Sequence, residues 1–162
     1  MLESALAQSR ELAAPWWTIM MLVPLRYVAL EQGDVRSAQV RLAEALHVAQ
    51  EIGERPAVAR GLEAFATLAA ALEQPAEALC LAGAAVALRG TITAPSFQPR
   101  AGFPRTWVDH GARALGQAPA EATWADGAAL TLAQAVSLSL QVDSTATLAS
   151  SRAYPRKTHA TA

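Results

Sequence analysis

The sequence predicts an all-α protein built from stacked pairs of helices, and three observations support this prediction. Hydrophobic residues make up 52% of the chain and many of them are alanine, which has the highest helix propensity. Runs of Val, Ile and Thr typical of strands are absent. Residues 33–49, GDVRSAQVRLAEALHVA, read as a turn and an amphipathic helix, and weaker copies lie about forty residues before and after them.

The helix expected at residues 35–52 has clear start and stop signals. Asp34 is a good N-cap residue, because its carboxylate accepts hydrogen bonds from free backbone N–H groups of the first turn. Gly53 ends this helix, and Pro56 suits the first turn of the next one. Five apolar residues share one face at the helical period: Ala38, Leu42, Ala45, Leu46 and Ala49.

A repeat of about forty residues organises the first half of the chain. When the chain is shifted by forty residues the matched positions are small and apolar, as where Leu22 falls on Leu62 and Ala45 on Ala85. Such self-similarity is typical of a solenoid, in which each helix pair buries its apolar face by stacking on its neighbours. The alternative explanation is chance agreement of small residues in an alanine-rich chain.

The predicted organisation has four segments. They are helical repeats at 1–89, a proline-rich loop at 90–105, capping helices at 106–142 and a disordered tail at 143–162. The repeats are expected to begin in mid-repeat, as in a fragment of something longer or a reduced version of it. The helices expected in the repeats lie at 1–13, 15–32, with a kink near Pro24, 35–52, 56–72 and 75–89.

The capping helices would cover the last apolar face of the solenoid. They are expected at 106–115, 119–125 and 132–140. Thr131, with Gln134 three residues later, forms a capping-box pattern just before the last of them.

Composition limits the classes of partner. The formal net charge is −1 with both signs interspersed, which argues against a nucleic-acid surface. The single cysteine, Cys80, excludes an internal disulfide framework and fits a reducing compartment. The apolar run at 13–25 is too short to span a bilayer and lacks the basic leader of a signal peptide. We therefore expect a cytoplasmic protein with no membrane partner.

Three stretches together resemble a known family. They are ALEQGDVRSAQVRLAEAL at 29–46, AALEQPAEALCLAGAAVALRG at 70–90 and WADGAALTLAQAVSLSL at 124–140. In this order they resemble the C-terminal tetratricopeptide-like repeat region of LuxR-type and maltose-regulator-like signal-transduction ATPases. The resemblance implies a tetratricopeptide-like helical-hairpin solenoid closed by short C-terminal capping helices.

The departures from that family limit what the resemblance implies. The sequence has no Gly-x-x-x-x-Gly-Lys-Ser/Thr loop, and residues 143–162 are too short and polar for a helix-turn-helix domain. Glu73 stands where the family prefers glycine. Neither ATPase nor DNA-binding activity is therefore carried over, and the expected role is the sensor or regulatory end of a bacterial transcriptional regulator.

The sequence shows no catalytic constellation, metal site or cofactor motif. Asp109 and His110 are adjacent, and neighbours on a helix point in different directions. Cys80 falls on an apolar helix face, where a free cysteine usually acts as a small hydrophobe. We expect His47 to be partly exposed. A hydrolase or transferase using Asp109–His110 or Cys80 is the less favoured alternative.

The tryptophans are interpreted mainly as structural. Trp124 is expected to pack the closing helices onto the last repeat. The alternative within binding proteins is a small-ligand sensor pocket between the last repeat and the closing helices, near Phe97, Phe103, Trp107 and Trp124.

The preferred function is a non-enzymatic module that binds a protein or peptide or associates with itself. In tetratricopeptide-like stacks the first helices line the concave face, and the candidate groove residues there are Tyr27, Arg60, Glu63 and Thr67. An N-terminal repeat face left open would expose apolar surface, and large patches of that kind mark interfaces. Its candidate interface residues are Leu2, Leu6 and Trp17.

Overall fold

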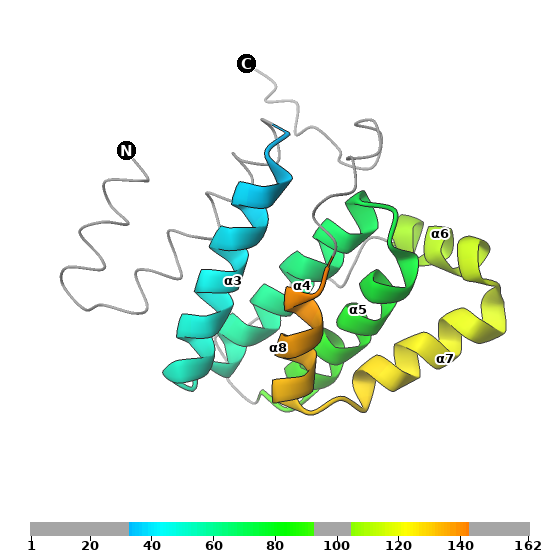
Figure 1. The fold of residues 1–162 in the computed structure, drawn as a ribbon. Helices are drawn as coiled ribbons and strands as arrows, with labels where there is room; N and C mark the ends of the chain where they lie inside the picture. The colour runs from blue at the N-terminus through cyan, green and yellow to red at the C-terminus, as the bar shows by residue number, and fades with distance from the viewer. Residues whose placement is uncertain (1–32, 93–104, 143–162) are drawn as a thin grey trace, which may run out of the picture.

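The described part of the chain is entirely helical. The computed structural model describes residues 33–92 and 105–142, with side chains in the second range described from residue 108 onward. Figure 1 shows its helices: α3 (Val35–Glu51), α4 (Arg55–Ala71), α5 (Pro75–Gly90), α6 (Arg105–Leu115), α7 (Gln117–Ala128) and α8 (Leu132–Leu140). The all-α prediction is confirmed for these residues, whereas the solenoid architecture stays a prediction.

The helices pack around α4 and α5. Helix α4 contacts α3 on one side and α5 on the other, and α7 packs extensively on α5. Helix α6 contacts both α5 and α7, while α8 lies over α4 and α5 and also reaches α3 (Figure 1). The closing helices therefore bring residues 105–142 back onto the helices at 35–90.

Helix α3 begins as its sequence predicts. The Ser37 backbone N–H donates to Asp34 Oδ1 at 3.0 Å. Hydrogen bonding to the Ser37 side chain, together with this backbone bond, lowers the pKa of the Asp34 carboxyl group. One face of the helix is buried, and it consists of Val35, Ala38, Leu42, Ala45, Leu46 and Ala49. All five apolar residues expected on that face therefore lie in the core.

Turns at intervals of twenty residues share the same backbone conformation. Gly33, Gly53 and Glu73 have positive φ angles of 74°, 71° and 56°. At the second turn the Glu54 N–H donates to Ala49 O at 2.9 Å, and at the third turn the Gln74 N–H donates to Ala69 O at 2.9 Å. These are Schellman motifs, which place their left-handed residue just after the helix. Glu73 thus takes a conformation that favours glycine.

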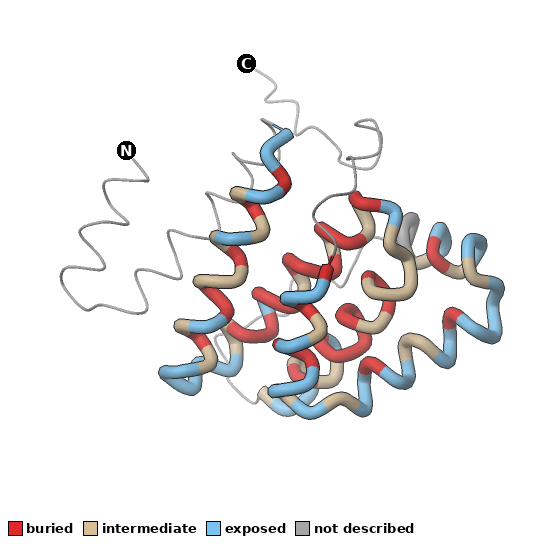
Figure 2. Tube along the Cα trace, viewed as in Figure 1, coloured by how far each residue is buried: buried red, intermediate tan, exposed pale blue. Residues whose placement is uncertain are grey.

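The core lies mainly between α3, α4 and α5 (Figure 2). Phe65 is completely buried at its centre, and α4 buries residues around most of its circumference. Trp124 of α7 is half-buried and packs against this core, which confirms its expected role in attaching the closing helices.

Helices α5 and α7 approach each other at two glycines. A Cβ atom on Gly83 of α5 would lie well inside van der Waals contact with the Trp124 carbonyl of α7. A Cβ atom on Gly127 of α7 would meet the Cys80 carbonyl of α5 in the same way. Each helix therefore presents its glycine to a carbonyl group of the other, and only glycine permits so close a backbone approach.

The closing helices largely match their predicted bounds. Helix α8 occupies 132–140 as expected, and both bonds of its capping box form: Gln134 N–H to Thr131 Oγ1 at 3.3 Å and Thr131 N–H to Gln134 Oε1 at 2.8 Å. Helix α6 begins at Arg105, one residue earlier than expected.

Helix α7 is longer than the predicted 119–125. It begins at Gln117, so Pro119 lies in the first turn, where a backbone N–H has no intrahelical partner in any case. The prediction was wrong because it took the proline as the first helical residue.

Several predictions lie outside the described residues: the helices at 1–13 and 15–32 with Pro24, most of the loop at 90–105, and the tail at 143–162. Leu2, Leu6, Trp17 and Tyr27 lie there as well. None of the helices described at 33–92 and 105–142 is both long and apolar enough to cross a bilayer.

Candidate functional site

From Val58 to Ala71, the residues of α4 that are not fully buried form a single stripe along the helix. We call Arg60, Glu63, Thr67, Ala70 and Ala71 the α4 stripe, since they follow one another at helical spacing and none is buried. All the remaining residues of α4 from Val58 to Ala69 are buried. Three of the predicted groove residues therefore share one accessible face, and the fourth, Tyr27, lies outside the described residues.

Within the α4 stripe, Glu63 makes an ion pair with the next helix. Its carboxylate accepts hydrogen bonds from Nε and Nη2 of Arg89 on α5, the latter at 2.6 Å. The two side chains are only 28% and 17% exposed, so solvent screens this pair less than it screens a surface pair. Glu63 thus helps to hold α4 against α5, a role that sequence reasoning missed because Arg89 lies 26 residues away in the chain.

The other two predicted groove residues differ in what they offer a partner. The Thr67 hydroxyl group donates to the Glu63 carbonyl oxygen of its own helix at 2.8 Å, so its proton is already used. Arg60 is exposed on the helix surface. Arg60 is therefore the charged residue of the α4 stripe that lies most openly toward solvent.

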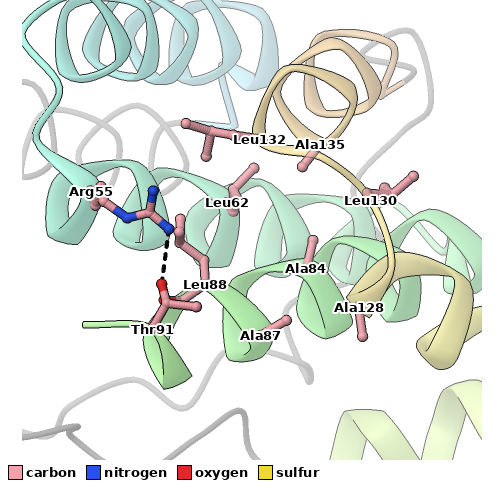
Figure 3. Close-up of a pocket in the computed structure, with 10 residues that line it drawn as sticks. All are labelled: Arg55, Leu62, Ala84, Ala87, Leu88, Thr91, Ala128, Leu130, Leu132 and Ala135. Carbon is pink, nitrogen blue, oxygen red and sulfur yellow. Dashed lines mark hydrogen bonds between the residues drawn. The ribbon is translucent and has the colours of Figure 1, made fainter. Parts of the chain in front are cut away.

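A pocket of about 270 Å³ lies between α4 and α5 on one side and the closing helices on the other. Four leucines and four alanines line it, and Leu62, Leu88 and Leu132 converge on it from three different helices (Figure 3). Its polar lining residues are Arg55 and Thr91. The place agrees with the alternative of a ligand pocket between the last repeat and the closing helices.

The residues of this pocket differ from those that the sequence indicated. Trp124 is not part of its lining and packs against the core instead. Phe97 and Phe103 lie outside the described residues, as does the side chain of Trp107. Small side chains at the α4–α5–α8 junction create the pocket, and no local pattern in the sequence marks such a junction.

Arg55 and Thr91, on the polar side of the pocket, are hydrogen-bonded to each other. Arg55 Nη2 donates to Thr91 Oγ1 at 2.9 Å, and Thr91 Oγ1 donates in turn to the Leu88 carbonyl oxygen at 2.7 Å. The single hydroxyl proton goes to Leu88, so the threonine oxygen is free to accept from the guanidinium group. The chain of bonds links the start of α4 to the end of α5.

The surroundings of Cys80 do not activate its thiol group. Cys80 is half-buried rather than fully buried, and burial raises the pKa of its thiol, with further contributions from the carboxylates of Asp126 and Glu77. A reactive cysteine needs the opposite, a cationic environment that stabilises the thiolate. The thiol therefore stays protonated at neutral pH.

The other polar candidates are dispersed over the surface. Asp109 and His110 are both exposed on α6, and Arg113 Nε donates to the Asp109 carbonyl oxygen at 3.3 Å. His47 is exposed as expected and lies 3.2 Å from Glu51, one turn further on. Within 33–92 and 108–142, no three His, Cys, Asp or Glu side chains come together as metal ligands.

Comparison with known proteins identifies no relative. No protein-family model matches the chain, and no curated protein or solved structure shows significant similarity to it.

Proposed function

We propose that this protein is a non-enzymatic helical-repeat module that binds a protein or peptide, or a second copy of itself. Its setting would be the sensor or regulatory end of a cytoplasmic bacterial transcriptional regulator or signalling ATPase. The observation that carries the proposal is the α4 stripe, because the face expected to line a groove is the face that α4 leaves accessible from Val58 to Ala71.

The recurring turns support a repeat architecture. Left-handed residues at Gly33, Gly53 and Glu73 follow one another at intervals of twenty, and α3 and α5 begin forty residues apart at Val35 and Pro75. A solenoid built from such units presents an extended binding surface rather than a closed catalytic cavity.

The dimensions of the α4 stripe fit a short segment of a partner chain. From Arg60 to Ala71 it extends about 16 Å along the helix at 1.5 Å per residue. An extended peptide covers that length with about five residues. The Glu63–Arg89 ion pair fixes α5 beside the stripe, so a partner would meet a surface that is already ordered.

Site-specific photo-crosslinking tests the proposal. A photoreactive amino acid replaces Arg60 in cells of the source organism, and the matched control carries it in place of Arg113, which is equally exposed but lies on α6. We expect a discrete crosslinked species from position 60 and none from position 113. Equal crosslinking from both positions, or none from either, would contradict a binding role of the α4 stripe.

Self-association is tested separately by light scattering across protein concentration, with a variant lacking residues 1–14 beside the full chain. A dimer that the truncation abolishes would support the predicted interface at Leu2, Leu6 and Trp17. A monomer in both cases would exclude self-association through that face and leave the α4 stripe as the binding surface.

A further inference from the structure

We propose that the pocket between α4, α5 and α8 binds a small apolar molecule with one carboxylate group, and that Arg55 binds the carboxylate. This site lies apart from the α4 stripe, so the inference goes beyond the proposed function and does not depend on it.

The walls of the pocket determine the apolar part of the ligand. They consist of leucine and alanine side chains, with Leu62 from α4, Leu88 from α5 and Leu132 from α8 facing one another (Figure 3). Ligand pockets are mostly apolar with a few well-placed polar groups. The volume of about 270 Å³ corresponds to roughly nine water molecules at about 30 Å³ each. A ligand of about ten non-hydrogen atoms would therefore fill it.

Arg55 determines the charge of the ligand. Its guanidinium group carries five N–H donors in a planar fork that suits a carboxylate, and the bond to Thr91 engages Nη2. Among residues 33–92 and 108–142, no acidic side chain forms an ion pair with Arg55. A ligand carboxylate would bind the remaining N–H donors of this exposed guanidinium group beside the apolar pocket.

The fold holds Arg55 in place over the pocket. Thr91 accepts from Arg55 and donates to Leu88, so the guanidinium group is tied to the end of α5. Arg55 also opens α4, and the partial positive charge at a helix N-terminus adds to the attraction for an anion. Thr91 is thus a positioning residue, whereas Arg55 would contact the ligand.

Binding would connect the closing helix to the helices that it covers. The pocket is lined from α4, α5, the end of α7, the turn before α8 and α8 itself, so a bound molecule would contact all of them at once. A ligand that binds only the folded protein raises the midpoint of thermal unfolding. The affinity of the site is therefore measurable without any activity assay.

Octanoate, which has ten non-hydrogen atoms, is a suitable probe for isothermal titration calorimetry on the full chain. Octanol and octylammonium have the same number of carbon atoms but no negative charge. We expect saturable binding of octanoate at one site, at least tenfold weaker binding of octanol and no binding of octylammonium. No saturable binding of octanoate, or equal binding of octanol, would overturn the proposal.

Two substitutions test the assigned roles. Arg55→Gln should weaken octanoate binding at least tenfold, while Arg36→Gln, at an exposed arginine of α3 outside the pocket, should leave it unchanged. Thr91→Val should weaken binding less than Arg55→Gln, since it removes the positioning bond only. Equal affinities for Arg55→Gln and the unsubstituted protein would show that Arg55 does not bind the ligand.

A third variant tests the location. Ala87 lines the pocket and is half-buried, so Ala87→Leu should fill part of the cavity and abolish octanoate binding. Circular dichroism controls for folding, and an NMR titration of the unsubstituted protein maps the site independently. Amide shifts confined to residues around Leu62, Leu88 and Leu132 would support the pocket, and shifts centred elsewhere would overturn it.

Discussion

The α3–α4 and α5–α7 interfaces each contain a buried helical glycine, yet they pack in different ways. At Gly61 of α4 an added Cβ atom would come within 2.7 Å of Leu46 Cδ1, the far end of a flexible side chain on α3. At Gly127 of α7 an added Cβ atom would overlap the Cys80 carbonyl group, which belongs to the backbone of α5. A side chain can move aside by changing its rotamer, whereas a helix backbone cannot.

This difference separates the two halves of the fold. The helices at 35–90 are joined through leucine, alanine and phenylalanine side chains, as at the fully buried Phe65. The closing helix α7 is joined to them through backbone contact at two glycines. The repeat interfaces should therefore tolerate changes of side-chain size that the α5–α7 interface does not.

Gly127→Ala should produce the largest effect. The new methyl group can fit only if α7 moves away from α5, and we expect a loss of about 3 kcal/mol in the free energy of unfolding. Chemical denaturation monitored by circular dichroism measures this loss. Ala125→Ser, at an exposed position of the same helix, is the control and should change stability by less than about 0.5 kcal/mol.

Gly61→Ala is the matched test of the repeat interface and should cost about 1 kcal/mol or less. Movement of the Leu46 side chain costs some packing energy, and alanine recovers about 0.5–1 kcal/mol in a helix interior relative to glycine. The same denaturation experiment measures it. A cost as large as that of Gly127→Ala would show that the two interfaces do not differ as described.

Glu73→Gly should stabilise the protein by about 0.5–1 kcal/mol, since glycine adopts a positive φ angle without steric strain. Gly53→Ala, in the equivalent turn, should destabilise it by a similar amount. If the two turns are equivalent, the midpoint of thermal unfolding should rise for Glu73→Gly and fall for Gly53→Ala. If Glu73→Gly destabilised the protein, the Glu73 side chain would contribute more to the free energy of unfolding than its left-handed backbone conformation costs.

The smallest effect concerns the cap of α3. The Ser37 hydrogen bond lowers the pKa of Asp34 in the folded protein, so this carboxylate stabilises the fold above the pKa that it has in the unfolded chain. That contribution is lost as the pH falls through the lowered folded pKa. Asp34→Asn keeps the capping geometry but removes the charge. Its stability should depend less on pH below about pH 4, as acid titration followed by circular dichroism would show.

The sequence predicted helix caps and helix ends correctly where the interacting residues lie within one turn of each other. Asp34 caps Ser37, Thr131 and Gln134 form the capping box, and Gly53 ends α3. Each of these depends only on residue type and spacing along the chain. Glu73 was recognised as a departure from glycine, but its left-handed conformation appeared only in the structure.

The candidate sites were predicted only in part. Helical spacing placed Arg60, Glu63 and Thr67 on one face, and the structure agrees because that spacing is a property of the helix itself. Glu63 and its partner Arg89 lie 26 residues apart, and Arg55 and Thr91 lie 36 residues apart. The pocket lining is wider still, since it runs from Arg55 to Ala135. Such pairs depend on how two helices cross, and the sequence of either helix alone does not specify this.

The amino-acid sequence by itself therefore determined the helices, their caps and the faces that they bury, because hydrogen bonds and apolar periodicity within one helix are local. Only the tertiary structure decided that α7 approaches α5 at Gly83 and Gly127 and that α8 encloses a pocket beside Arg55. The physical reason is that close packing between helices depends on the shapes of both surfaces at once.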